Sequence, residues 1–243
     1  MIANVNEGGY FMVIETKVGD VNGDMIPDII YLTGDKYEGN PYYQNIKIVV
    51  EDGMTRYRYV IPLSPNYNTG SDPWIFLGGF ISNRVQDIFI GLPLNNRSVY
   101  YIISFLFNRP DFILTPEKYP ENYDMLSKEL DFAVIYKDFY KVDITSSKLN
   151  QTFTLDVSSR KQDYEGVIYN KDGTLIKPFN GFVLYSPYLY PVNFYGEPFR
   201  LMAMDDIAGM SHADTLGQLV YYFKFSSQQR IWTLDPKQAQ VLI

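Results

Sequence analysis

The sequence predicts an all-β protein, specifically a small β-propeller of four or five blades, with a β-sandwich that carries a calcium loop as the alternative. The prediction rests on many short strand-like runs, a weak internal repeat, and an aromatic content of 16% that includes 22 Tyr and 16 Phe. Aromatic and β-branched residues fit the half-buried surface of a pleated sheet. Short strands with regular turns are typical of sandwiches, barrels and propellers.

The strand-like runs extend along the whole chain and are separated by turn residues. Residues 152–157 alternate strictly between polar and apolar side chains, as expected for a strand with one buried face. The other runs are residues 10–14, 28–32, 45–50, 57–63, 87–90, 99–107 and 219–225. We also expect strand at 215–220 and a short helix at 120–130. Because no low-complexity linker interrupts the chain, residues 1–243 are predicted to form a single domain.

An internal repeat suggests how these strands are organised. Asp28 begins the run Asp-Ile-Ile, and Asp87 begins a similar run 59 positions later. Asp143 follows after another 56 positions and Arg200 after a further 57. A four-stranded propeller blade with its loops has about this length. The spacing therefore predicts about four degenerate repeats, closed into a ring by pairing of the N- and C-terminal strands.

Charge and composition disfavour several classes of partner and of chemistry. The net charge is −7, and an acidic surface repels both nucleic-acid phosphates and anionic lipid headgroups. We therefore expect no nucleic-acid or membrane partner. Cysteine is absent, which excludes disulfides and thiolate sites. The first lysine is Lys17, so no basic segment of a secretory signal is visible, and we expect a cytoplasmic protein.

One loop carries a recognisable metal-binding pattern. Asp20, Asn22, Asp24 and Asp28 occupy loop positions 1, 3, 5 and 9, and the backbone carbonyl of Ile26 would supply position 7. Calcium takes six to eight oxygen ligands, so alternating carboxylates and amides in a tight turn suit it. These five residues are the predicted ligands of one Ca²⁺ ion.

Two alternatives to a calcium loop of this kind exist. In an EF-hand the sixth position is glycine and the twelfth glutamate, but here they are Met25 and Tyr31, so an EF-hand is excluded. A loop rich in Asp and Asn also closes through its own side-chain hydrogen bonds without any metal. That metal-free turn remains the alternative to a calcium loop.

The pattern resembles an FG-GAP repeat, also called VCBS, the unit of integrin-type propellers. The residues that carry the resemblance are Val-Gly-Asp-Val-Asn-Gly-Asp at 18–24 and Pro-Asp-Ile-Ile at 27–30. The resemblance implies a propeller fold and calcium ligation by Asp20, Asn22, Asp24 and Asp28. More widely, the chain resembles small VCBS-repeat proteins of spore-forming bacteria, which adds a spore association as an alternative location. Weaker matches lie at 76–80 with 85–88, at 189–191 and at 212–217.

The corresponding loops of the other repeats lack most of the ligands, so we expect a single calcium site. The aligned residues are Gly79, Ile81, Asn83 and Asp87; Ile135, Lys137, Phe139 and Asp143; and Val192, Phe194, Gly196 and Arg200. A one-residue slip in the last loop adds only Asn193 and Glu197 as oxygen donors.

The remaining candidates for chemistry are weak. His212 is the single histidine, and we expect a local turn or hydrogen bond there, with Asp214 two residues away. Asp205 and Asp206 are adjacent, so as strand residues they would point to opposite faces, and we predict a solvated bend instead. We assign no catalytic residue.

The predicted function is a calcium-stabilised, non-enzymatic binding or scaffold module whose partner is an unidentified protein or carbohydrate. Propellers present loops on a rigid support, and binding sites gather on such loops. The alternative is a carbohydrate-active, glycosidase-like propeller enzyme that uses carboxylates, because glycoside hydrolysis requires two of them.

Overall fold

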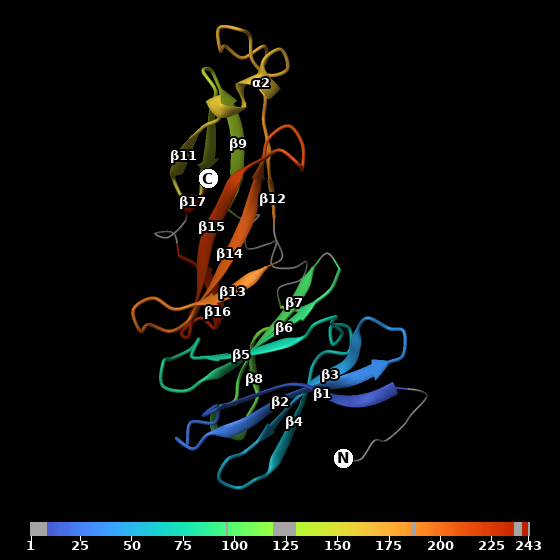
Figure 1. Cartoon of the computed structure of the whole chain (residues 1–243). Helices are drawn as coiled ribbons and strands as arrows, with labels where there is room; N and C mark the ends of the chain where they lie inside the picture. Colours follow the sequence, from blue (N-terminus) through green and yellow to red (C-terminus); the bar gives the residue numbers. More distant parts are fainter. Residues whose placement is uncertain (1–8, 96, 119–129, 186–187, 236–239, 243) are drawn as a thin grey trace. The chain divides into compact units, whose positions relative to one another are not determined.

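The computed structural model describes residues 9–95, 97–118, 130–185, 188–235 and 240–242 and shows an all-β protein, as predicted (Figure 1). Helical segments in the described residues are short: η1 (Leu106–Asn108), η2 (Ser158–Arg160) and α2 (Lys161–Tyr164). The helix expected at 120–130 lies almost entirely outside the described residues. No helix among the described residues is long and apolar enough to span a membrane.

The chain separates into two compact units, which are described separately. The first comprises residues 1–122, 191–201 and 224–233, and the second comprises 123–190, 202–223 and 234–243. The organisation of residues 1–243 as one propeller-like domain stays a prediction.

The first unit contains two four-stranded antiparallel sheets in which each strand pairs with the next along the chain (Figure 1, blue to green). The first sheet consists of β1 (Gly9–Gly19), β2 (Asp28–Tyr37), β3 (Tyr43–Glu51) and β4 (Arg58–Pro62). The second consists of β5 (Trp74–Gly78), β6 (Asp87–Pro93), β7 (Ser98–Ser104) and β8 (Asp111–Leu114).

The two sheets bury a common hydrophobic core. Ile30 and Leu32 of β2 and Ile88 and Ile90 of β6 are completely buried and belong to one cluster of side chains. They are spaced by two residues because successive side chains of a strand alternate between its faces. Burying a side chain of this size stabilises the native state by about 1.5–3 kcal/mol.

The first two members of the predicted repeat share one structural feature. Asp28 is the first residue of β2, and its Oδ2 accepts a hydrogen bond of 3.1 Å from the backbone N–H of Val21. Asp87 is the first residue of β6, and its Oδ2 accepts one of 2.7 Å from Phe80. In both sheets the aspartate at the start of the second strand therefore closes the loop that precedes it.

The third and fourth members differ from this arrangement. Asp143 is the third residue of β10, and its carboxylate accepts a hydrogen bond of 2.7 Å from the hydroxyl of Thr154. Arg200 begins β14 and forms an ion pair with Glu197. The prediction of four structural repeats therefore stays a prediction.

The rest of the chain forms two further sheets. One has three strands in the order β11 (Gln151–Asp156), β10 (Lys141–Ser146) and β9 (Phe132–Lys137). The other contains β12 (Phe182–Leu184), β14 (Arg200–Ala208), β15 (Thr215–Ser226) and β16 (Ile231–Leu234) in that order. In this sheet β13 (Leu189–Val192) pairs with β14, and β17 (Gln240–Leu242) pairs with β15.

Two structural expectations were wrong, whereas the strand predicted at 215–220 is confirmed within β15. The strand expected at 99–107 ends at Ser104, because the backbone enters η1 and Phe107 takes a left-handed conformation with φ of 55°. The last described strand, β17, pairs with β15 and not with β1. The described residues thus show no closed ring of blades.

Candidate functional site

The predicted calcium loop connects β1 to β2, and its first turn is closed by Asp20. The two carboxylate oxygens of Asp20 accept hydrogen bonds of 2.7 and 3.0 Å from the backbone N–H groups of Gly23 and Met25. Gly23 has a φ of 89°, a left-handed conformation that glycine adopts without steric cost. Both oxygens of Asp20 are therefore used to hold the backbone of the loop.

The same turn chemistry continues at the next two polar residues. Asn22 Oδ1 accepts a hydrogen bond of 3.0 Å from the N–H of Asp24, and Asp24 Oδ1 accepts one of 2.8 Å from the N–H of Ile26. These are the local side-chain turns that Asp and Asn favour. The loop is therefore closed by its own hydrogen bonds in the way that the metal-free alternative requires.

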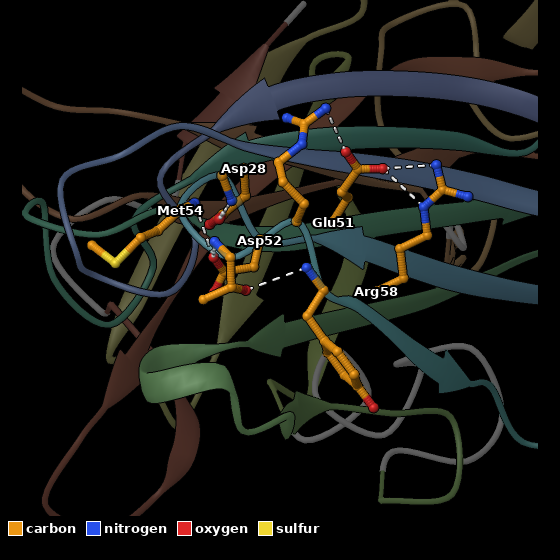
Figure 2. A network of polar contacts seen from close by, with 9 residues as sticks. Asp28, Glu51, Asp52, Met54 and Arg58 are labelled. Atoms are coloured by element: carbon orange, nitrogen blue, oxygen red, sulfur yellow. Dashed lines mark hydrogen bonds and ion pairs between the residues drawn. The ribbon is translucent and has the colours of Figure 1, made fainter.

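Behind this turn, three carboxylates converge on a single amide group. The side-chain nitrogen of Asn22 lies 3.4 Å from an oxygen of Asp24, 3.4 Å from one of Asp28 and 3.3 Å from one of Asp52. Figure 2 shows the side chains of Asp28 and Asp52 close together in this network. We refer to Asp24, Asp28 and Asp52 as the three-carboxylate cluster.

Most of the cluster is removed from solvent. Asp28 is 0% exposed, Asp52 2% and Asn22 4%. Burial raises the pKa of Asp28 because it disfavours the ionised form, while hydrogen bonds from the N–H groups of Gly53 and Val21 act in the opposite direction. The pKa of Asp52 is lowered, first by the N–H of Thr55, which stabilises the ionised carboxylate.

Asp52 is a member of the cluster that sequence reasoning missed. Asp52 lies in the turn after β3, where its Oδ1 accepts hydrogen bonds of 2.9 and 2.7 Å from the N–H groups of Met54 and Thr55. Ile29 of β2 pairs with Glu51 of β3, so their neighbours Asp28 and Asp52 lie side by side. This proximity could be predicted only if the pairing of β2 with β3 were known in advance.

Asn108 extends the network from η1 of the second sheet. Its side-chain nitrogen donates a hydrogen bond of 3.0 Å to Asp52 Oδ2. Its side-chain oxygen is buried and has no hydrogen-bond partner within the described part of the chain. The adjacent Phe107 N–H donates to the backbone carbonyl of Asn22 at 2.9 Å, so η1 is bonded both to the loop and to Asp52.

Neutral groups donate the hydrogen bonds that the cluster receives. They are the backbone N–H groups and the amides of Asn22 and Asn108 already described. The nearby cations Arg56 and Arg58 instead form ion pairs with Glu51, at 2.9 and 2.8 Å. Figure 2 shows the pair between Arg58 and Glu51. The negative charge of the three-carboxylate cluster is thus not offset by these arginines.

The structure brings together only part of the predicted ligand set. Asn22, Asp24 and Asp28 meet, whereas the carboxylate of Asp20 binds the loop backbone and Ile26 contributes its N–H to Asp24. Within the described residues, no group of three or more His, Cys, Asp or Glu side chains is arranged so that it could hold a metal ion. The arrangement is a buried acidic network and not a preformed metal cage.

The other weak candidates take structural roles. His212 is exposed, and its ring lies 5.2 Å from that of Phe182. Asp214 does close a local turn by bonding the N–H of Met210, but its carboxylate also binds Arg160 and accepts a hydrogen bond of 2.9 Å from the hydroxyl of Tyr164. This anchoring function of Asp214 was not expected from the sequence.

The solvated bend predicted at Asp205 and Asp206 is wrong, because both residues lie within β14. Asp205 is 0% exposed and accepts a hydrogen bond of 2.6 Å from the hydroxyl of Tyr221. Asp206 accepts one of 3.1 Å from the side chain of Gln218. Since neighbouring residues of a strand face opposite sides, the two carboxylates diverge, as a strand geometry requires.

Together these features define an all-β protein in which an acidic loop, closed by its own hydrogen bonds, connects the first two strands of the first sheet. The model of the YybI C-terminal domain family matches residues 130–241. Over 222 residues the chain is 32% identical to a Bacillus subtilis (strain 168) protein described as "Uncharacterized protein YybI", and the match covers 90% of this chain and 81% of that protein. The chain therefore belongs to the YybI family. No solved structure matches it significantly.

This finding corrects the resemblance to FG-GAP (VCBS) repeats, which was wrong. Both comparisons identify the YybI family, and neither supports an FG-GAP repeat. The physical reason lies in the shortness of the motif. Alternating Asp and Asn in a turn form side-chain-to-backbone hydrogen bonds in many unrelated loops, so the pattern specifies a local conformation and not a family.

Proposed function

We propose that the first unit is a calcium-stabilised, non-enzymatic binding or scaffold module and that one Ca²⁺ ion binds beside the loop at residues 20–28. The observation that carries this proposal is the convergence of Asp24, Asp28 and Asp52 on the side-chain nitrogen of Asn22. Calcium prefers several oxygen ligands, including carboxylates, and tolerates irregular geometry.

In this proposal the ion takes the position near the amide nitrogen of Asn22. Asp24, Asp28 and Asp52 then supply carboxylate oxygens, and Asn22 supplies its oxygen after the amide group rotates. The buried oxygen of Asn108, which has no hydrogen-bond partner among the described residues, would serve as a further ligand, since the Asn108 side chain is bonded to Asp52. Asp20 would bind the ion only if its hydrogen bonds from the N–H groups of Gly23 and Met25 were broken.

Electrostatics supports a cation at this position. Three carboxylates served by neutral donors repel one another, and burial raises the pKa of Asp28. A divalent cation would offset this repulsion and would stabilise the native state by mass action, because the unfolded chain has no such cluster.

The scaffold part of the proposal rests on the two repeated sheets. Each is a four-stranded antiparallel sheet whose second strand begins with a loop-closing aspartate. This is the form of a propeller blade, so we propose a propeller-like stacking of these two sheets as the rigid support. The enzyme alternative is weaker, because the adjacent carboxylates Asp205 and Asp206 face opposite sides of one strand.

Calcium titration by calorimetry tests the proposal with three proteins. We expect about one Ca²⁺ per native chain, loss of binding in Asp52→Asn, and unchanged binding in Asp72→Asn, which alters an exposed aspartate outside the cluster. Circular dichroism of each variant checks the fold. Absence of heat and of any calcium-dependent spectral change in the folded native protein would contradict the calcium site.

A further inference from the structure

A hollow of about 390 Å³ lies in the first unit, beside the loop that precedes β6. It is bordered by the rings of Phe76 and Phe199 and by the polar side chains of Asn83, Arg84 and Gln86. Its volume lies within the range of small-molecule sites, which combine apolar walls with a few polar groups.

Aromatic rings form one wall of the hollow. The rings of Phe76 and Phe199 have centroids 5.1 Å apart, and Phe199 also packs against Phe80 at 5.7 Å. The N–H of Phe199 donates a hydrogen bond of 2.8 Å to the carbonyl of Gly79, which holds the ring in place. Phe76 and Phe199 are only partly buried, so both contribute apolar surface to the hollow.

The two loops that form the hollow are bonded to each other. The side-chain nitrogen of Asn83 donates a hydrogen bond of 2.6 Å to the carbonyl of Gly196. Asn193 Oδ1 in turn accepts one of 3.2 Å from the N–H of Gly196. A hollow whose walls are bonded together before a ligand arrives requires less ordering when the ligand binds.

The hollow is also bordered by a charged side chain that forms no ion pair within the described residues. Arg84 is exposed, and its guanidinium has no ion pair within the described ranges. The amide of Gln86 is directed toward Gly19, where an added β-carbon would lie 1.9 Å from the amide oxygen. Glu197, the acidic residue on the rim, is paired with Arg200 at 2.7 Å. A cation without an ion pair and an aromatic wall therefore border the same hollow.

We propose that this hollow binds a sugar unit that carries a carboxylate. Arg84 would pair with the carboxylate, since a guanidinium matches a carboxylate through two parallel hydrogen bonds. The side-chain oxygen of Asn83 would accept a hydrogen bond from a hydroxyl group, because an amide oxygen is an acceptor. The apolar face of the sugar ring would lie against the phenylalanine wall. The inference deepens the proposed binding function but does not depend on the calcium site.

The test compares a matched pair of disaccharides, cellobiouronic acid and cellobiose, which differ at one carboxylate. Binding is measured by calorimetry and by ligand-observed NMR with chelator present, so that calcium bridging cannot contribute. We expect cellobiouronic acid to bind at least about tenfold more tightly than cellobiose, an effect of the size that one charged hydrogen bond produces.

Two variants distinguish binding in the hollow from a general effect of the protein's charge. Arg84→Gln should weaken the binding of cellobiouronic acid about tenfold, and Arg97→Gln, which alters another exposed arginine, should leave it unchanged. Equal affinity for both sugars, no detectable binding, or full retention by Arg84→Gln would overturn the proposal. Sugar binding that persists in Asp52→Asn, together with loss of calcium binding in that variant, would show that the sugar site and the calcium site are independent.

Discussion

The aspartates that begin β2 and β6 illustrate how single residues determine local structure. Asp28 and Asp87 are both buried, each accepts a hydrogen bond from the N–H seven residues earlier, and burial raises the pKa of both. A buried carboxylate costs free energy when it is ionised, and its hydrogen bonds offset part of that cost. These residues thus hold the loops in place, but their ionisation near neutral pH lowers the free energy of unfolding.

Asp87→Asn should change how stability depends on pH. Because the pKa of Asp87 is raised above its ordinary value, the native state binds more protons than the unfolded state between those two pKa values. Its contribution to the free energy of unfolding therefore falls as pH rises through that window. The asparagine variant keeps an oxygen for the N–H groups of Phe80 and Ile81 and should lack this component.

Urea unfolding from pH 4 to pH 7 measures the difference between the native protein and Asp87→Asn. Asp28 contributes a slope of the same sign in both proteins, and Asp52, with a lowered pKa, contributes the opposite sign at lower pH. Both effects cancel in the difference. A difference that does not vary with pH would show that Asp87 is ionised equally easily in both states.

Asp52→Ala should destabilise the first unit by about 2 kcal/mol. The change removes the acceptor for the N–H groups of Met54 and Thr55 and for the amides of Asn22 and Asn108, and unpaired buried donors are costly. Denaturant unfolding provides the measurement. Asp72→Ala, at an exposed position, is the control and should lie within about 0.5 kcal/mol of the native protein.

At the scale of elements, the second sheet depends on a glycine opposite a tryptophan. Gly91 of β6 pairs with Trp74 of β5, and a β-carbon at Gly91 would lie 2.2 Å from the indole ring. The ring also packs edge-on against Phe89, with centroids 5.0 Å apart. The position of the indole therefore depends on the absence of a side chain across the strand.

Gly91→Ala should destabilise the protein by roughly 1–3 kcal/mol, because the added methyl group forces the indole out of its place. The measurement is denaturant unfolding followed by tryptophan fluorescence. A Trp74→Leu background supplies the control, since removal of the indole should relieve much of the cost in a double-mutant cycle. An equal cost in both backgrounds would exclude this overlap as the cause.

At the scale of the whole molecule, calcium should raise the melting temperature. A ligand that binds only the native state stabilises it by RT ln(1 + [L]/Kd), about 2.7 kcal/mol at one hundred times Kd. We expect excess chelator to lower the melting temperature and added calcium to restore it, as measured by differential scanning fluorimetry. The shift should be absent in Asp52→Asn. An unchanged melting temperature despite measured calcium binding would mean that the site is peripheral to the fold.

Membership in the YybI family applies to the whole molecule as well. The match to the relative covers 90% of this chain, and that protein is described as uncharacterized. The calcium and sugar experiments therefore test functions for which the relative's description gives no indication. If native calcium binding is found, the same titration on the relative would show whether the acidic loop has a shared function.

The sequence by itself determined what depends on neighbours along the chain. Strand alternation at 152–157 and the turn chemistry of Asp20, Asn22 and Asp24 follow from side-chain direction and local hydrogen bonds. The repeat of Asp28 at Asp87 was visible as a spacing, and the fold class followed from the same local patterns. Family membership did not follow, because a short turn motif is common to unrelated proteins.

Only the tertiary structure decided which distant residues meet. Asp52 lies 24 positions after Asp28 and Asn108 a further 56, yet both belong to the network around Asn22. The burial of Asp205 against Tyr221 and the hollow beside Arg84 likewise join segments that are separate in sequence. Local patterns specify strands and turns, but strand pairing and sheet packing select the long-range contacts, and those contacts create buried charge and binding surfaces.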